Sequence, residues 1–208
     1  TADGYDIFIS KFEAAGNLVW GQHMGGAGDE MANGIGVDGS GNVYTTGKFT
    51  GTVDFDPGTG GTSYTATGFS DAFLTRLDAG GNLIWATKIG GPGLDHGTAL
   101  EMAVDGGIVW TGGFQDTIDI EIGSGVTNLY NAEGTDILVA KFNPNITLAW
   151  AKSMGGNGTD WGYAVALDAN ENVYLTGQFT QDCDFDPNAG TAILSSLGEN
   201  DIYVMKLG

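Results

Sequence analysis

The chain has 208 residues, of which 26 are acidic and 7 are Lys or Arg, so its formal net charge is −19 at pH 7. This balance excludes a nucleic-acid-binding domain, which needs a basic surface. No apolar run approaches the roughly 20 residues that span a bilayer, so we expect no transmembrane segment. A single cysteine, Cys183, rules out an internal disulfide. The hydrophobic fraction of 41% is too high for an acidic disordered tail, which leaves an acidic, glycine-rich globular protein.

The sequence repeats with a period of 65 residues, and six classes of residue keep this step. They are Trp20/Trp85/Trp150, the doublets that begin at Gly25/Gly90/Gly155, Gly47/Gly112/Gly177, Phe49/Phe114/Phe179, Asp6/Asp71/Asp136/Asp201 and Lys11/Arg76/Lys141/Lys206. We therefore interpret residues 1–208 as one repeat domain. Its units cover about 6–70, 71–135 and 136–200, and residues 201–208 begin a fourth unit.

In chain order, each unit indicates short strands that are separated by turns. A strand is predicted first at residues 6–12 and again at 71–77, where apolar and polar residues alternate. A second strand precedes each glycine doublet, as at 83–89. A strand rich in Gly and Ala follows, then a tight turn, and then a strand such as 42–47. A longer excursion, residues 49–69 in the first unit, carries Asp-Phe-Asp-Pro.

No stretch of ten or more residues has a helical period, so the prediction is an all-β protein. Repeated strand-turn units with glycine at the turns are typical of β-propellers. Small residues suit the innermost strand of a blade, and Trp and Phe suit the faces between blades. We expect three four-stranded blade units and a spare strand at the ends, since the first and last strands are copies of the same element.

Two segments resemble the bacterial SBBP (β-propeller) repeat family: residues 71–93, DAFLTRLDAGGNLIWATKIGGPG, and residues 35–47, IGVDGSGNVYTTG. The resemblance extends over the whole chain, three times. The Asp-Phe-Asp-Pro insert is similar to a longer version in secreted or surface proteins of bacteria. The resemblance implies a propeller fold and an extracytoplasmic setting, and it implies no catalytic residues.

The acidic inserts are the best candidate metal sites, because Ca²⁺ prefers six to eight oxygen ligands and the acids alternate along the chain. The candidate ligands are Asp54, Asp56, Asp119, Glu121, Asp182, Asp184, Asp186 and Asn188. In the alternative interpretation, these acids end a strand and hydrogen-bond their own backbone in turns. Both interpretations stay open at this stage.

A second acidic set follows the glycine doublets at Glu30, Asp95 and Asp160. These residues could add metal ligands, or they could form ion pairs with the basic class that contains Arg76. The repeated aspartate class that contains Asp71 is expected to start a strand or hold a turn.

Two tryptophans, Trp110 and Trp161, lie outside the repeated classes. They are candidates for a glycan-binding surface, and ordinary core packing is the alternative. A catalytic site has little support, because His23 and His96 have no partner motif and repetition argues against one asymmetric active site. Cys183 lies between two acids, which should raise its pKa and make it a poor nucleophile.

The sequence thus predicts a non-catalytic, extracellular or cell-surface repeat module, stabilised by Ca²⁺, that acts in scaffolding, adhesion or self-assembly. Self-association would use the unpaired end strands or neighbouring repeats of a longer chain. A carbohydrate-binding propeller is the first alternative, with glycans as ligands, and a propeller hydrolase is the second.

Overall fold

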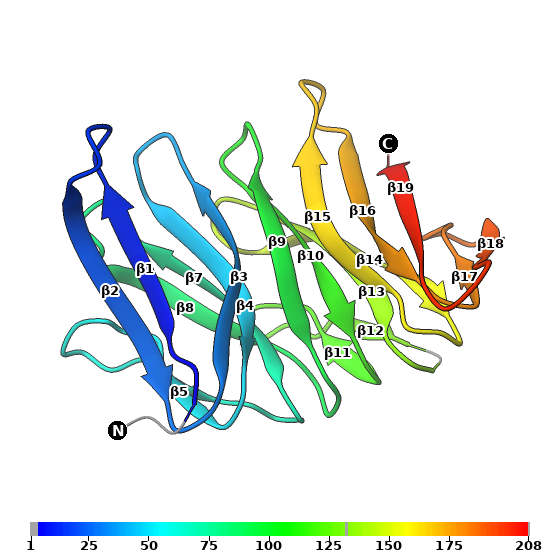
Figure 1. Cartoon of the computed structure of the whole chain (residues 1–208), viewed down its shortest axis with the longest axis horizontal. Coiled ribbons are helices and arrows are strands. Elements are labelled where there is room, and N and C mark those ends of the chain that lie inside the picture. The colour runs from blue at the N-terminus through cyan, green and yellow to red at the C-terminus, as the bar shows by residue number, and fades with distance from the viewer. Residues whose placement is uncertain (1–3, 132, 208) are drawn as a thin grey trace.

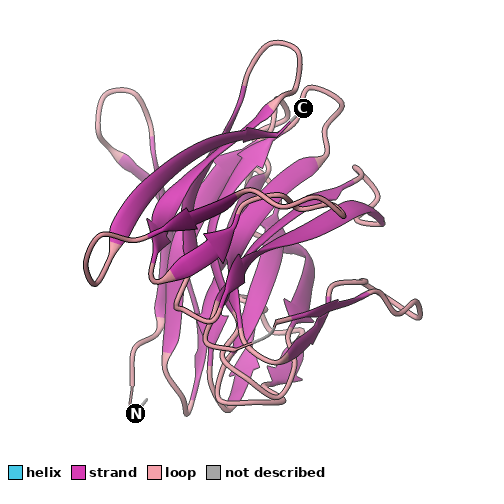
Figure 2. Ribbon diagram, turned by 90° about the vertical axis from the view of Figure 1, so that its right-hand side faces the viewer, coloured by secondary structure: helices cyan, strands magenta, loops and turns pink. Residues whose placement is uncertain are grey.

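The computed structural model describes residues 4–131 and 133–207. Its regular elements are strands, arranged as antiparallel sheets that stand side by side (Figure 1). The view at right angles shows strands joined by loops and turns (Figure 2). Among these residues, no helix is long and apolar enough to cross a membrane. The predicted all-β class is confirmed.

Two sheets form complete blades, and β3 and β9 are their innermost strands. The first blade runs in the order β3 (Glu30–Val37), β4 (Val43–Phe49), β7 (Asp71–Leu77), β8 (Leu83–Ile89). The second blade begins with β9 (His96–Met102), β10 (Ile108–Phe114), β13 (Asp136–Phe142), β14 (Leu148–Gly156). Consecutive strands pair antiparallel in both blades, and β9 packs against β3 of the blade before it.

A partial blade flanks the complete blades on each side (Figure 1). The N-terminal partial blade contains β1 (Ile7–Phe12) and β2 (Leu18–Gly26), which correspond to the third and fourth strands of a complete blade. The C-terminal partial blade contains β15 (Trp161–Leu167), β16 (Val173–Phe179) and β19 (Asp201–Leu207), which correspond to the first three strands.

The acidic excursions fold as short hairpins that cross back to the blade before them. These hairpins are β5–β6 (Thr52–Asp54 and Ser63–Thr65), β11–β12 (Thr117–Asp119 and Asn128–Tyr130) and β17–β18 (Asp182–Asp184 and Ile193–Ser195). β5 pairs with β2, β17 pairs with β14, and β11 is bridged to the end of β8 through Gly90 and Asp119. Each hairpin thereby extends the outer edge of the preceding blade.

The sequence unit and the structural blade are therefore out of phase. One 65-residue unit supplies the two outer strands of one blade, the two inner strands of the next blade, and the hairpin that returns to the first. The expected division into three four-stranded units needs this correction: the described residues form two complete blades between two partial ones. The period in the sequence identifies equivalent residues, but it does not show where a blade begins.

The core consists of three apolar clusters, one at each junction between consecutive blades. Phe49, Phe114 and Phe179 are buried in these clusters, which confirms their predicted packing role. Phe49 also contacts Phe55 of the acidic hairpin, with ring centroids 5.3 Å apart and the planes perpendicular. The aromatic residue between the two acids therefore anchors the hairpin to the core.

Candidate functional site

The most unusual feature of the surface is a set of apolar side chains at its two ends. Phe8 on β1 is 78% exposed, although its repeat equivalents Phe73 and Leu138 are fully buried. At the other end, Ile202 and Val204 on β19 are 84% and 77% exposed. Their equivalents in the second blade, which lie one period earlier on β13, are fully buried. Exposed apolar patches of this kind mark interaction surfaces.

The two ends expose opposite faces of the same structural strand. On β7, the face with Leu74 packs toward the following blade, and the face with Phe73 packs toward the preceding one. β19 exposes the face that contacts a following blade, and β1 exposes the face that contacts a preceding blade. The two end faces are therefore complementary and not identical.

The predicted Ca²⁺ ligands lie in the loops of the outer hairpins and at their bases. In the third repeat, Asp184 Oδ1 accepts hydrogen bonds from the backbone N–H groups of Asp186 (3.0 Å) and Ala192 (2.8 Å). These two donors lower the pKa of Asp184. Asp186 Oδ1 in turn accepts from the N–H of Asn188 (2.9 Å). Each acid therefore holds the turn through its own backbone.

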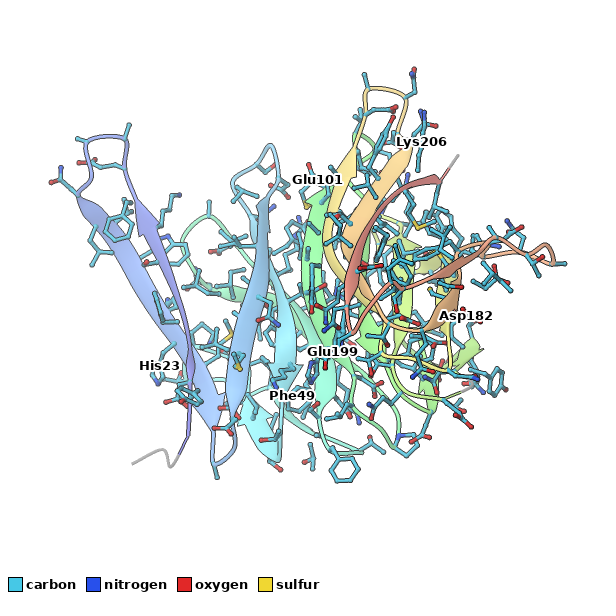
Figure 3. The ribbon with its side chains drawn as sticks, turned by 45° about the vertical axis from the view of Figure 1, so that its right-hand side comes forward. His23, Phe49, Glu101, Asp182, Glu199 and Lys206 are labelled. Atoms are coloured by element: carbon cyan, nitrogen blue, oxygen red, sulfur yellow. The ribbon has the colours of Figure 1, made fainter. Side chains whose placement is uncertain are left out.

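The other two hairpins repeat this arrangement. Asp54 Oδ1 accepts from the N–H groups of Asp56 and Thr62, and Asp119 Oδ1 accepts from those of Glu121 and Thr127. Asp182 instead accepts from the hydroxyl of Ser195 on the opposite strand (2.5 Å). Asp182 lies on an outer hairpin at the opposite side of the molecule from His23 (Figure 3).

Within residues 4–131 and 133–207, no three His, Cys, Asp or Glu residues are gathered closely enough to hold a metal ion. The hairpin acids form pairs, and their turn-holding Oδ1 atoms are already occupied by N–H donors. A cation at such a loop would use the remaining carboxylate oxygens, with backbone carbonyls and water completing its shell.

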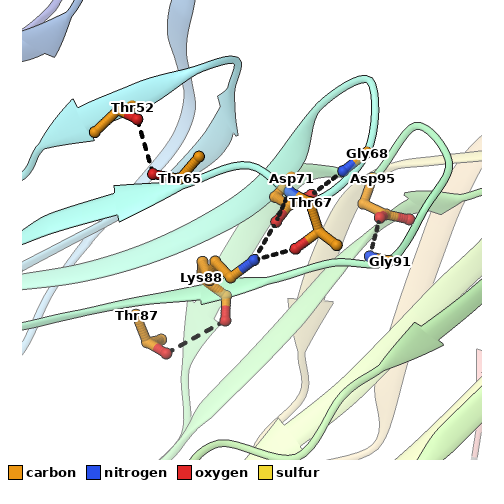
Figure 4. Close-up of polar contacts among 9 residues, drawn as sticks. All are labelled: Thr52, Thr65, Thr67, Gly68, Asp71, Thr87, Lys88, Gly91 and Asp95. Carbon is orange, nitrogen blue, oxygen red and sulfur yellow. Dashed lines mark hydrogen bonds and ion pairs between the residues drawn. The ribbon is translucent and has the colours of Figure 1, made fainter.

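The second acidic set is buried, and no pattern in the sequence indicated this. Asp95 and Asp160 are fully buried, and Glu30 is nearly so. Asp95 Oδ2 accepts a hydrogen bond from the N–H of Gly91 (2.6 Å), the second glycine of the doublet, and lies beside Asp71 (Figure 4). Glu30 accepts from Gly26 in the same way (3.0 Å). The second and third repeats thus hold a buried acidic pair under the glycine doublet, Asp71 with Asp95 and Asp136 with Asp160, whereas Asp6 of the first repeat is exposed.

Burial raises the pKa of Asp95 to about 7, and the nearby charge of Asp71 adds to this shift. Burial also raises the pKa of Asp136 to about 7, with Asp160 contributing. Among residues 4–131 and 133–207, one oxygen of each of Asp95, Asp136 and Asp160 finds no hydrogen-bond partner. A buried, unpaired carboxylate favours the protonated form, so these pairs hold a proton near neutral pH.

The repeats differ in the charge beside the pair. In the second repeat, Lys88 donates to Asp71 Oδ2 (2.8 Å) and to the hydroxyl of Thr67 (Figure 4). The equivalent positions are His23 and Ser153. Asp71 also accepts from the N–H of Thr67 (3.0 Å), so the predicted turn-holding role of this class is confirmed.

The predicted ion pairs between the second acidic set and the basic class are wrong. Arg76 pairs with Asp38 (3.3 Å), and Lys141 pairs with Asp105 (3.1 Å) and Glu171 (2.8 Å). All three acids lie in the turns that follow the innermost strands. The buried acids lie at the far ends of those strands, where the basic side chains do not reach them.

The glycine doublets have two separate steric roles. A Cβ on Gly90 or Gly155 would overlap the carboxylate of Asp71 or Asp136. A Cβ on Gly91 or Gly156 would overlap the backbone carbonyl oxygen of Thr117 or Asp182 on the returning hairpin. Only glycine allows the acid and the hairpin to approach this closely.

The structure separates the two unusual tryptophans. Trp110 is 0% exposed, and its Nε1 donates to Thr46 Oγ1 (2.8 Å), so it packs in the core and cannot contact a ligand at the surface. Trp161 lines a groove with Asn33, His96, Thr98 and Tyr163. Cys183 is buried, and its pKa is raised by that burial and by Asp160, as expected for a poor nucleophile.

The side-by-side antiparallel blades and the 65-residue repeat define the chain as a β-propeller-type repeat protein. Residues 19–51 match the family model described as "Beta-propeller repeat" (SBBP), which confirms the family resemblance for this segment. An uncharacterized WD repeat-containing protein of Acanthamoeba polyphaga mimivirus is 24% identical over 89% of this chain. The regulatory protein FlaEY of Caulobacter vibrioides is 26% identical over 88%. The chain covers 15% and 20% of the lengths of these relatives.

Proposed function

We propose that this chain is a non-catalytic scaffold segment whose two end faces bind further repeats of the same kind. The observation that carries this proposal is the exposure of Ile202 and Val204, because their equivalents Ile137 and Val139 are fully buried between blades. The repeat-family match and the repeat-containing relative support the scaffold class.

The contacts at the end faces follow from an existing junction. Ile137 and Val139 share a core cluster with Val165 and Tyr203 of the next blade. The repeat equivalent of Tyr203, three periods earlier, is Phe8, which is exposed at the opposite end. A second copy can therefore place Phe8 against Ile202 and Val204. Burial of each such side chain contributes about 1.5–3 kcal/mol.

Backbone pairing is a second way in which two copies can associate, because β1 and β19 each stand at the edge of a sheet. It is an alternative to the stacking of Phe8 on Ile202 and Val204, since two strands either stack face to face or pair edge to edge. An open edge presents unpaired N–H and C=O groups that can accept another strand. Since the two end faces differ, the contact is head-to-tail, and repetition of it gives a ring or a filament.

Adhesion or filament formation at the cell surface, with Ca²⁺ bound at the acidic hairpins, is the finer form of this proposal. The family resemblance supports the extracytoplasmic setting. The net charge of −19 and the loop acids support cation binding, because a bound cation would relieve self-repulsion.

Light scattering after size-exclusion chromatography tests the end-face proposal. At about 100 µM, a concentration that favours association with a Kd in the micromolar range, we expect particles larger than the 21.5 kDa monomer. The double substitution Ile202→Asp and Val204→Asp should restore the monomer. Ile193→Asp is the matched control, because Ile193 is an exposed isoleucine on the outer hairpin β18. A monodisperse 21.5 kDa wild-type species would refute the proposal.

A further inference from the structure

The groove that contains Trp161 is built on three neighbouring innermost strands, β3, β9 and β15. It measures ≈ 370 Å³ and is lined by Asn33, His96, Thr98, Trp161 and Tyr163. Asn33, Thr98 and Tyr163 are exact repeat equivalents, and His96 and Trp161 are also equivalents of each other. The groove thus consists of two repeat positions that are presented side by side by consecutive blades.

Asn33, Thr98 and Tyr163 are all bulged residues. On each innermost strand, the residues on both sides of the bulge pair with the second strand of the blade, and the bulged residue itself has no pairing partner there. The flanking residues are Ala32 and Gly34 on β3, Gly97 and Ala99 on β9, and Gly162 and Ala164 on β15. A β-bulge re-aims a side chain, and bulges are frequent beside binding sites.

A constant framework supports the bulges. A Cβ on Gly47, Gly112 or Gly177 would overlap the carbonyl oxygen of the residue two positions before the bulge, which is Met31, His96 or Trp161. This glycine is present in all three repeats. The residue whose carbonyl it approaches (Met31, His96 or Trp161) and the bulged residue (Asn33, Thr98 or Tyr163) differ from repeat to repeat. Repeat proteins commonly vary their binding positions on a constant framework.

The groove also contains a space made for one particular ring. Trp161 packs over Gly113, where a Cβ would lie 2.6 Å from Trp161 Cε3. The other repeats carry Lys48 and Gln178 at the Gly113 position. The His96 ring packs beside the Trp161 ring, and the two ring centroids are 5.2 Å apart.

The bulged side chains join neighbouring blades and keep other polar atoms available. Asn33 Nδ2 donates to the carbonyl oxygen of Gly97 (2.9 Å), and Thr98 Oγ1 donates to that of Gly162 (2.5 Å). The Oδ1 atom of Asn33 remains an available acceptor. Tyr163 is 47% exposed and presents an aromatic ring with a hydroxyl at the mouth of the groove.

The groove has no charge at neutral pH. None of the lining residues is acidic or basic except His96, whose Nε2 hydrogen-bonds with Ser70 Oγ (3.0 Å). Burial and the nearby Lys48 lower the pKa of His96 to about 4, so the imidazole is neutral at pH 7. Aromatic surfaces combined with neutral hydrogen-bonding groups suit a ligand that has apolar faces and hydroxyl edges.

We propose that this groove binds a neutral carbohydrate, with Trp161 and Tyr163 contacting the faces of the sugar rings and Asn33, His96 and Thr98 contacting their hydroxyl groups. This inference goes beyond the scaffold function. It uses the innermost strands of consecutive blades, whereas the scaffold proposal depends on Ile202 and Val204 of β19 and on Phe8 of β1 at the opposite end.

An array of immobilised neutral and acidic oligosaccharides provides the test, followed by calorimetry with the neutral glycan that binds most strongly. Tyr163→Ala should weaken binding at least tenfold, and Trp161→Phe should also weaken it. Tyr130→Ala is the matched control, because Tyr130 is an exposed tyrosine on the outer hairpin β12, and it should bind like the wild type. Circular dichroism establishes that each variant is folded.

Binding should not change between pH 5.5 and 8, because His96 stays neutral over this range. Three results would overturn the inference: no neutral glycan is retained, only sialylated or sulfated glycans are retained, or Tyr163→Ala binds with unchanged affinity.

Discussion

Thr46 and Trp110 occupy the second strands of consecutive blades, and the indole Nε1 of Trp110 donates to the Thr46 hydroxyl at 2.8 Å. Thr46 Oγ1 in turn donates to the carbonyl oxygen of Phe73 at 2.8 Å. Both side chains are fully buried. One hydroxyl therefore connects two strands of the same blade and joins that blade to the next.

Thr46→Val should destabilise the protein by about 1–3 kcal/mol, because the replacement leaves the indole N–H of Trp110 buried without this acceptor and removes the hydrogen bond to the carbonyl of Phe73. Thr176→Val is the matched control: Thr176 makes the equivalent hydrogen bond to Tyr203 (2.7 Å) but is exposed. Urea unfolding of both variants measures the difference. Equal losses would show that the contact between blades adds nothing to stability.

Gly91→Ala should destabilise the protein by about 1–3 kcal/mol, the usual range for overpacking. The new methyl group would overlap the carbonyl oxygen of Thr117, which is backbone and cannot rotate away. Gly21→Ala is the control, because a Cβ at that strand position meets no atom within 4 Å. Urea unfolding measures both variants. A Gly91→Ala variant with the same urea midpoint as the wild type would contradict the steric role of the doublet.

The buried acids should make the protein less stable as pH rises from about 4 to 7. The folded pKa of Asp95 and of Asp136 is about 7, and the unfolded value is about 3.9. Between these values the folded state binds more protons than the unfolded state, so the free energy of unfolding falls with increasing pH and levels off above 7.

Urea unfolding at pH 5, 6, 7 and 8 measures this slope. Asp136→Asn should reduce the slope but not abolish it, because the amide does not titrate and Asp95 still does. Asp78→Asn should leave the slope unchanged, because hydrogen bonds from Asn82 lower the pKa of Asp78 and move its titration below this window. Wild-type stability that rises between pH 5 and 8 would show that the acid pairs are ionised in the folded protein.

Millimolar Ca²⁺ should raise the Tm of EGTA-treated protein by several degrees, since a ligand at 100 times its Kd adds roughly 2.7 kcal/mol per site. Mg²⁺ at the same concentration should have little effect. Asp186→Asn should reduce the Ca²⁺ shift, because Asn keeps the Oδ1 acceptor for the N–H of Asn188 and removes the charge. A Tm that does not respond to Ca²⁺ would leave these acids with the turn-holding role alone.

The 65-residue period, the all-β class and the packing role of Phe49, Phe114 and Phe179 could all be predicted from the sequence. These features depend on local alternation, turn residues and repetition, which are visible along the chain. The turn-holding role of the aspartates was also accessible, because an Asx turn joins residues two apart.

Other features depended on which segments meet in space. The return of each hairpin to the preceding blade, the burial of Asp95 beside Asp71, and the groove formed by Asn33, Thr98 and Tyr163 all join residues that are distant in the sequence. The period shows that two residues are equivalent, but it does not show whether a neighbouring blade covers them. For this reason Trp110 and Trp161 were indistinguishable in the sequence, and only the tertiary structure placed one in the core and the other in a groove.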